Sequence, residues 1–311
     1  MRGSWGAWIV AAAIVALVTF PLLRPPRIRD ESAGPWRMIM RRFRQNRGAC
    51  TALGIVLALY IIAALAPALA PYPPNAQPDP IAMQVLAPSG AHLMGTDLVS
   101  RDVFSRVLHG ARVSLAIGLL AVLLSITVGT IYGAAAGFIG GKTDAVMMRI
   151  IDALLSIPRI LLLIMVTALW GQLSILLLVL LIGMTGWFGV SRVVRAEVMA
   201  VSARDFVISA RSLGASRLRV LSRHVLPNVL SPVIVAATLG IGNVIILETG
   251  LSFLGLGVQP PQPSWGSIIQ DGAQQVSAHW WISVFPGLAI VTTVMAFNAV
   301  GEGLRDALDP R

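Results

Sequence analysis

The segment Ala136–Thr143 contains the residues that come closest to a catalytic motif. Its sequence, AGFIGGKT, resembles the glycine-rich loop that binds phosphates in nucleotide-binding proteins, with alanine in the first glycine position. That loop follows a β-strand, whereas this segment follows a long apolar stretch, and no second nucleotide motif accompanies it. A helix break at Gly140-Gly141, with Lys142 at a membrane surface, explains the same residues more simply. We therefore predict that this chain binds no nucleotide.

The histidines and the single cysteine have no spacing typical of a metal or redox site. His92, His109, His224 and His279 are far apart in the sequence, although distant residues can still meet in a fold. Cys50 lies inside an apolar run and has no second cysteine with which to form an intrachain disulfide. We predict neither a catalytic residue nor a metal site. A membrane enzyme would need a cluster of acids or histidines at one depth.

Glu248 is the acid inside an apolar run that could act on a transported solute. An ionisable group within a membrane span is a candidate functional residue, so we predict that Glu248 lines a translocation path. Its position at the outer end of the run leaves open that it is solvated among the headgroups. No set of mid-membrane acids and bases accompanies it, which disfavours a channel or a stand-alone, ion-driven transporter.

The composition indicates the elements that must carry these residues. Of 311 residues, 56% are hydrophobic and 12% are charged, whereas a soluble domain has about 25% charged residues. The apolar residues form runs near or above the roughly 20 residues that a membrane-spanning helix needs. We predict an all-α polytopic membrane protein with six core helices. The runs cover residues 48–70, 110–137, 145–170, 172–190, 229–247 and 281–300.

The basic residues set the predicted topology. Residues 24–47 contain eight Arg and residues 191–228 contain seven, whereas residues 249–280 contain neither Lys nor Arg. By the positive-inside rule the two basic segments are cytoplasmic, and six crossings place the tail 301–311 in the cytoplasm as well. The net charge of +10 therefore reflects topology, and no basic face with interleaved aromatic residues predicts nucleic acid as a partner.

Three local patterns add further expectations. Trp5–Leu23 is apolar and flanked by Arg, which predicts an extra N-terminal helix; a misassigned translation start is the alternative. Ser100–His109 has the pattern of a short amphipathic helix at a membrane interface, with Arg101, Asp102 and Arg106 on its polar face. The small residues Ser125, Gly129, Gly133 and Gly137 repeat every four positions, which predicts a groove for close packing of a neighbouring helix.

The cytoplasmic segment 200–228 is the most informative part of the chain. Its spacing predicts a short helix over Asp205–Leu213, a stop at Gly214 and a second helix over Arg217–Leu226 that Pro227 limits. Two short helices joined at a glycine and rich in Arg form a docking surface.

This segment resembles the signature loop of the permease subunits of ATP-driven ABC importers. In that loop Glu-Ala-Ala is followed four residues later by glycine and then by Ile-x-Leu-Pro. Ile208-Ser209-Ala210 occupies the triplet here, Gly214 the glycine, and His224–Pro227 the ending. Ile208 replaces the usual acid, so the resemblance does not carry over a carboxylate contact at that position.

Further stretches are similar to the second permease of the dipeptide, oligopeptide and nickel importer family, and together they cover residues 36–311. They include MGTDLVSRDVFSRVLHGARVSL, where Ser100 departs from an expected glycine, and ETGLSFLGLGVQPPQPSWGSIIQDG. On this basis we divide the chain into an N-terminal extension over 1–35, a basic segment with the first core helix and outer loop over 36–107, and the permease core over 108–311.

The resemblance implies a type I ABC importer permease fold and a non-catalytic role in the cytoplasmic membrane of a bacterium or archaeon. It implies as partners a homologous second permease, two ATPase subunits that bind the ATP and Mg²⁺, a solute-binding protein on the outer side, and the lipid bilayer. The implied cargo is a di- or oligopeptide, with a nickel chelate or another small solute as alternatives. The implied contacts to the ATPases are Arg204, Asp205, Phe206, Ser209, Ala210, Arg211, Leu213, Gly214 and Ala215.

Overall fold

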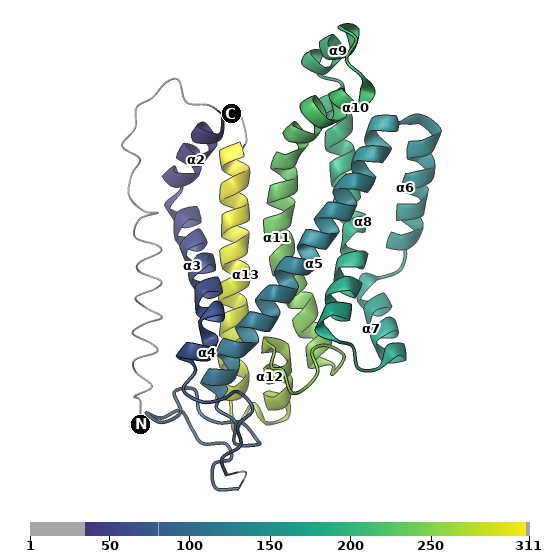
Figure 1. The fold of residues 1–311 in the computed structure, drawn as a ribbon. Helices are drawn as coiled ribbons and strands as arrows, with labels where there is room; N and C mark the ends of the chain where they lie inside the picture. The colour runs from purple at the N-terminus through teal and green to yellow at the C-terminus, as the bar shows by residue number, and fades with distance from the viewer. Residues whose placement is uncertain (1–34, 80, 309–311) are drawn as a thin grey trace.

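The computed structural model describes residues 35–79 and 81–308, and over these residues the chain is helical (Figure 1). The extra helix predicted over Trp5–Leu23 lies outside the described residues. Within them, Thr96 and Asp102 form an isolated bridge, and no β-strand forms. The α-helices are α2 (Pro35–Gln45), α3 (Arg47–Ala64), α4 (Ala66–Leu69), α5 (Val103–Ile139), α6 (Gly141–Leu155), α7 (Arg159–Trp170), α8 (Ile175–Ser202), α9 (Asp205–Ser212), α10 (Arg217–Val220), α11 (Leu226–Phe253), α12 (Trp265–Gly272) and α13 (Trp281–Leu308).

The predicted membrane spans are present, with one of them broken. Five stretches of the described chain are long and apolar enough to cross a bilayer: α3, α5, α8, α10 with α11, and α13. The predicted run 145–170 is instead two helices, α6 and α7, bent by 69° at Ser156–Pro158, and the pair makes a sixth candidate span. Proline lacks an N–H and clashes with the preceding turn, which is why the helix breaks there.

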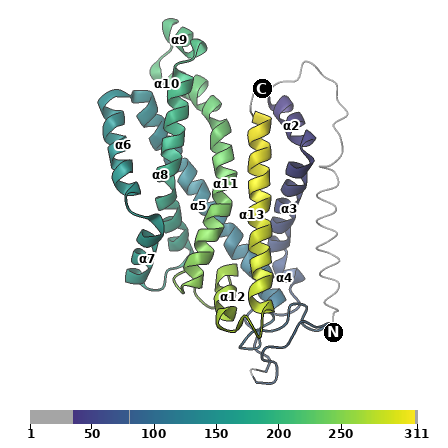
Figure 2. The same cartoon turned by 180° about the vertical axis from the view of Figure 1, so that it is seen from behind.

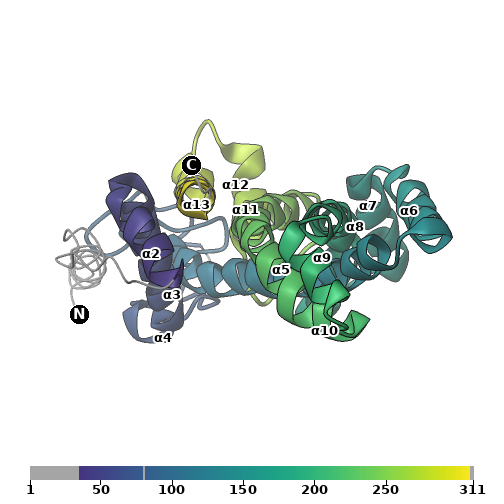
Figure 3. The same ribbon diagram turned by 90° about the horizontal axis from the view of Figure 1, so that it is seen from above.

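The bundle has two distinct ends. One end carries α9, α10, α2 and the last residues of α13, and the other carries α4, α12 and the long loop before α5 (Figure 1). Helix α5 crosses the bundle obliquely, with α3 and α13 toward one edge and α6 and α7 toward the other (Figures 2 and 3). The main core forms where α5 packs against α8, α11, α12 and α13, and Leu115, Ile245 and Trp265 are buried there.

The predicted small-residue groove lies on α5 and packs against α8. A Cβ atom added to Gly133 would lie 2.3 Å from the backbone oxygen of Ser191, and one added to Gly137 would lie 2.8 Å from that of Arg195. Backbone atoms of two helices approach this closely only where a side chain is absent. The Ser125 hydroxyl continues the same contact by donating a hydrogen bond to the carbonyl of Gly183 at 2.8 Å. The packing prediction is confirmed.

The loop Gly140-Gly141 is a helix break, as predicted. Both glycines have a positive φ, of 70° and 58°, and they join the end of α5 to the start of α6. The flanking elements are helices on both sides, so the strand that precedes a phosphate-binding loop is absent here.

The separate interfacial helix predicted over Ser100–His109 is wrong. Helix α5 begins at Val103 and continues without a break into the membrane, and Asp102 caps it by accepting a hydrogen bond from the backbone N–H of Ser105 at 2.8 Å. Arg106 belongs to this helix and is only 3% exposed. The pattern within Ser100–His109 predicts that Arg106 is solvated, because Asp97 and Asp271, the acids that pair with it, lie outside that segment.

The limit predicted at Pro227 is also wrong. After α10 the chain forms a π-helical turn over Leu221–Val225 and passes directly into α11. The N–H of Leu226 bonds to the carbonyl of Leu221 in this π turn, and Pro227, which has no N–H, follows in the first turn of α11. The π turn therefore joins the short cytoplasmic helix to the membrane span, where we had predicted a stop.

Ser100 provides a testable difference from the glycine expected at this position. Its φ is 63°, a conformation that costs an L-residue about 1–2 kcal/mol, and its buried hydroxyl has no hydrogen-bond partner among the described residues. We expect Ser100→Gly to stabilise the protein by about 1 kcal/mol after the greater entropy of unfolded glycine is subtracted. Thermal unfolding of the purified permease checks this. The same substitution at the exposed Ser277 is the control, and an equal shift there would contradict the explanation.

Candidate functional site

Helix α9 forms the first part of the predicted docking segment, and Gly214 ends it. The N–H of Ala215 donates to the carbonyl of Ala210 at 3.1 Å, and the N–H of Gly214 donates to that of Arg211 at 3.0 Å. With Gly214 at a φ of 85°, these two bonds form a Schellman helix end, a motif that needs a left-handed residue at this position. The predicted helix over Asp205–Leu213 and its stop at Gly214 are confirmed in shape.

Most of the predicted contact residues are exposed. Ala210 and Ala215 are half-buried, and the others present their side chains or backbone to the surface. The exposed residues of the predicted set are Arg204, Asp205, Phe206, Ser209, Arg211, Leu213 and Gly214. The structure therefore brings the set together at one end of the molecule, while contact with a partner stays a prediction.

Val207, which the sequence reasoning missed, holds α9 to the rest of the chain. It is fully buried against a cluster that includes Val201, Val220 and Val229, so it anchors the helix by its apolar face. The guanidinium of Arg211 lies 5.3 Å from the centre of the Phe138 ring, near the end of α5. The sequence carries little signal for this anchor, because the residues three, four and seven positions after Val207 are Ala210, Arg211 and Gly214.

The exposed side chains of the docking segment are more apolar than predicted. Leu213 is 88% exposed and Ile208, which stands where the family has an acid, is 51% exposed. Phe206 and Leu218 are also exposed large hydrophobic residues of this segment. We call Phe206, Ile208, Leu213 and Leu218 the apolar docking patch. Several large exposed apolar side chains within one short segment are typical of a protein–protein contact.

Glu248 lies in the protein interior, which excludes the alternative that it is solvated among the headgroups. The carboxyl group is fully buried on α11 and accepts hydrogen bonds from the hydroxyls of Ser252 at 2.7 Å and Ser114 at 3.3 Å. Ser114 in turn accepts the backbone N–H of Trp265 at 3.2 Å, at the start of α12. This network joins α5, α11 and α12. In this chain the carboxyl is enclosed, and the path-lining role of Glu248 stays a prediction.

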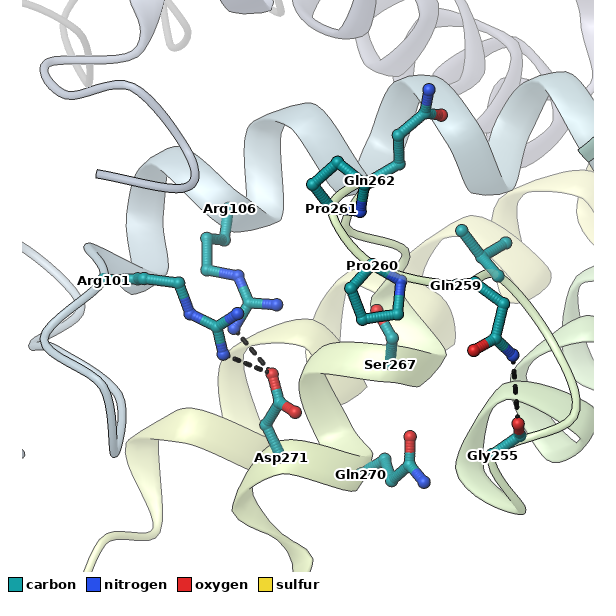
Figure 4. A pocket seen from close by; sticks show the side chains of 11 residues that line it. Arg101, Arg106, Gly255, Gln259, Pro260, Pro261, Gln262, Ser267, Gln270 and Asp271 are labelled. Atoms are coloured by element: carbon teal, nitrogen blue, oxygen red, sulfur yellow. Dashed lines mark hydrogen bonds and ion pairs between the residues drawn. The ribbon is translucent and has the colours of Figure 1, made fainter. Parts of the chain in front are cut away.

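A charged cluster joins the loop before α5 to α12 (Figure 4). Arg106 Nη1 lies 2.6 Å from Asp97 Oδ2 and 2.7 Å from Asp271 Oδ2, while Arg101 reaches the same two acids at 2.6 and 2.8 Å. The cluster borders a cavity of about 260 Å³. The cavity is lined by Arg101, Arg106, Gly255, Val258, Gln259, Pro260, Pro261, Gln262, Ser267, Gln270 and Asp271.

The charges of this cluster balance, and their arrangement holds the outer loops together. Two arginines face two aspartates, so a charged ligand would have to displace an existing ion pair. Asp97 and Arg101 are four residues apart, so the sequence itself places the two partners of this ion pair close together. Asp271 follows Arg106 by 165 residues, and no local pattern indicates that pairing.

A series of polar contacts joins α6 and α7 to α8, and the sequence reasoning missed it by treating residues 145–170 as one apolar run. Both nitrogens on one edge of the Arg195 guanidinium contact Asp144, at 2.5 and 2.6 Å. Arg192 pairs with Asp152 farther along the same face. Arg159, the first residue of α7, instead contacts two neutral groups of α8. The signal was the arginine directly after Pro158, at the start of the mainly apolar stretch 160–170.

Comparison with known proteins agrees with this arrangement. Residues 125–311 match the family described as the binding-protein-dependent transport system inner membrane component, and residues 34–88 match the N-terminal transmembrane domain of oligopeptide transport permease C. A dipeptide transport system permease of Bacillus subtilis is 40% identical over 272 residues, which are 87% of this chain and 84% of that protein.

Two further relatives extend the match over nearly the whole chain. An oligopeptide transport system permease of Haemophilus influenzae is 38% identical over 90% of each chain. A glutathione transport system permease of Escherichia coli O6:K15:H31 is 40% identical over 95% of this chain and 96% of that protein. With more than half of its length inside the family model and these identities, the chain belongs to the family of binding-protein-dependent transport system inner membrane components.

Proposed function

We propose that this chain is one of two homologous permease subunits of an ATP-driven peptide importer, coupled to ATPase subunits through the segment 204–228. The observation that carries the proposal is the apolar docking patch beside the Schellman turn at Gly214. A buried valine fixes the helix beneath this patch, so a force applied to its surface reaches the bundle as a rigid-body movement. Membership of a binding-protein-dependent transport family supports the same role.

The proposal assigns a side of the membrane to each end of the bundle. The end with α2, α9 and α10 carries most of the arginines and faces the cytoplasm, where two ATPase subunits bind. The last residues of α13 lie at this end, so the C-terminus is cytoplasmic as well (Figure 1). The end with α12 and the loop before α5 faces outward and receives the solute-binding protein. ATP hydrolysis belongs to the partners, and this chain is non-catalytic.

Peptides are the proposed cargo. The relatives above are named for the transport of dipeptides, oligopeptides and glutathione, and all three classes of solute contain peptide bonds and free carboxylates. These names support a peptide cargo over a nickel chelate. The path itself forms at the interface with the second permease, by alternating exposure of that interface to the two sides.

Reconstitution into liposomes tests the proposal. The chain is purified together with the permease, ATPases and binding protein encoded by neighbouring genes, and uptake of a labelled peptide mixture is measured. We expect uptake only when ATP, the binding protein and both permeases are present. Uptake by this chain alone, driven by a proton or sodium gradient, would instead establish a stand-alone transporter.

A further inference from the structure

Arg159 is a positive charge at the middle depth of the membrane-spanning bundle. It is the first residue of α7, directly after the bend that interrupts the α6–α7 span. Its contacts on α8, Ile182 and Thr185, lie roughly 10 to 15 Å along the helix axis from Ile175, where α8 begins, at 1.5 Å per residue. The hydrocarbon layer is about 30 Å thick. The guanidinium is therefore far from both headgroup regions.

The surrounding residues hold this guanidinium in place without neutralising it. Its Nε donates to the Thr185 hydroxyl at 3.1 Å and its Nη2 donates to the Ile182 carbonyl at 2.7 Å. A Cβ on Gly186 would lie 3.1 Å from Nη2, so the glycine leaves the space that the guanidinium occupies. Arginine has five N–H donors, and these two hydrogen bonds leave three of them for another acceptor.

Two arginines on α8, Arg192 and Arg195, provide a comparison for Arg159 of α7. Arg192 and Arg195 lie farther along α8, about 26 and 30 Å from its start by the same rise per residue, near the cytoplasmic boundary. Each forms an ion pair with a carboxylate of α6, Asp152 and Asp144 respectively. Among the described residues, no carboxylate forms an ion pair with Arg159. The deepest of the three arginines is thus the one with neutral partners.

The guanidinium of Arg159 is unsuited to lipid, although the helix that carries it is not. Helix α7 buries only Leu163 and Thr167, and its exposed large side chains, among them Leu161, Met165 and Leu169, are apolar and can face lipid. An arginine at the bilayer centre is unfavourable even on the mildest insertion scale. Such residues therefore face a water-filled cavity or a bundle interior. The surface beside Ser156 and Arg159 is best satisfied where it borders the interface with the second permease, which is where the path forms in the function proposed above.

We propose that Arg159 binds the carboxylate of the peptide cargo inside the translocation path. This inference rests on the proposed function and deepens it. A carboxylate has the planar shape and charge to accept two hydrogen bonds from the free edge of a guanidinium, and such charge-assisted pairs are strong where water is scarce. Peptides with a free C-terminus or an acidic side chain supply that group, and a C-terminal amide does not.

The test measures binding to the complete complex in nanodiscs without the binding protein, so that selection by that protein does not enter. The probes are trialanine and its C-terminal amide, titrated by calorimetry. We expect the wild type to bind the acid at least about tenfold more tightly than the amide, and Arg159→Gln to remove this preference. Arg192→Gln is the matched control, because that arginine has its own carboxylate and the preference should persist.

A second variant keeps the test decisive if Arg159→Gln fails to assemble. Thr185→Asp places a carboxylate beside the guanidinium, so it fills the position proposed for the cargo while retaining the arginine. We expect it to reduce acid binding to the level of the amide, with normal copurification of the second permease.

Three outcomes would overturn the inference. Equal or undetectable binding of acid and amide by the wild type is one, and a preference that survives Arg159→Gln is another. Loss of the second permease from the Arg159→Gln complex, with the preference unchanged in Thr185→Asp, would assign Arg159 to the subunit interface instead. Peptide uptake in the liposome assay is scored separately, so the importer role stands or fails on its own.

Discussion

Replacing Gly214 with valine should abolish ATP-driven peptide uptake while leaving the permease in the membrane. The backbone at Gly214 has a φ of 85°, and a β-branched residue in this conformation costs at least about 1–2 kcal/mol. The Schellman end at Ala210 and Arg211 would open to relieve the strain, and Leu213 would leave its present position. The measurement is uptake in proteoliposomes, normalised to the amount of reconstituted permease.

The environment of Gly214 allows this effect to be separated from ordinary misfolding. A Cβ added there meets no atom of this chain within 4 Å, so a larger side chain creates no clash inside the permease. Asparagine tolerates the left-handed conformation better than alanine or valine. We expect uptake to fall in the order Asn, Ala, Val, with equal amounts of protein in the membrane. Normal transport by Gly214→Val would remove the coupling role from this turn.

Replacing Gly133 with leucine should prevent stable packing of α5 against α8. The Cβ would lie 2.3 Å from the Ser191 carbonyl oxygen and 2.9 Å from Val194 Cβ, and a backbone atom cannot rotate away. Overpacking costs about 1–3 kcal/mol in ordinary cores, and contact with backbone raises it beyond that range. We expect a large loss of full-length permease from membranes and a lower unfolding temperature of the remainder.

Two alanine substitutions provide the matched comparison. Gly133→Ala introduces only the Cβ, and the short contact to α8 predicts a smaller loss of the same sign. Gly189→Ala lies on α8, where the added Cβ meets nothing within 4 Å, and should leave the unfolding temperature unchanged or raise it slightly. If both variants unfold alike, helix propensity and not the α5–α8 contact determines the stability at these sites.

The features that the sequence predicted correctly depend on local patterns. Apolar runs identify the spans, the four-residue repeat identifies the groove on α5, and the glycine at 214 identifies the end of α9. In each case the signal and its consequence lie within one helix or one turn. The packing partner of the groove on α5 was not specified by any pattern within that helix.

The errors depend on partners that are distant in the sequence or on alternatives available to the backbone. The sequence does not predict the burial of Arg106 or Glu248, because their hydrogen-bond partners Asp271 and Ser114 are 165 and 134 residues away. Pro227 predicts the end of a helix, but the backbone forms a π-helical turn before it and continues into α11. Arg159 has no local signal of its own beyond Pro158, because the average hydropathy of residues 145–170 stays high despite Arg149, Asp152 and Arg159.

The ion pairs between α6 and α8 have a consequence for the order of biosynthetic events. Asp144 and Asp152 are translated before Arg195 and Arg192, so both acids lack these partners until α8 has been synthesised. Pairing then lowers the cost of both charges without help from another protein. Arg159 gains only neutral partners from α8. A newly made chain can therefore satisfy the acids of α6 by itself, whereas folding alone gives the guanidinium of Arg159 no carboxylate from α8.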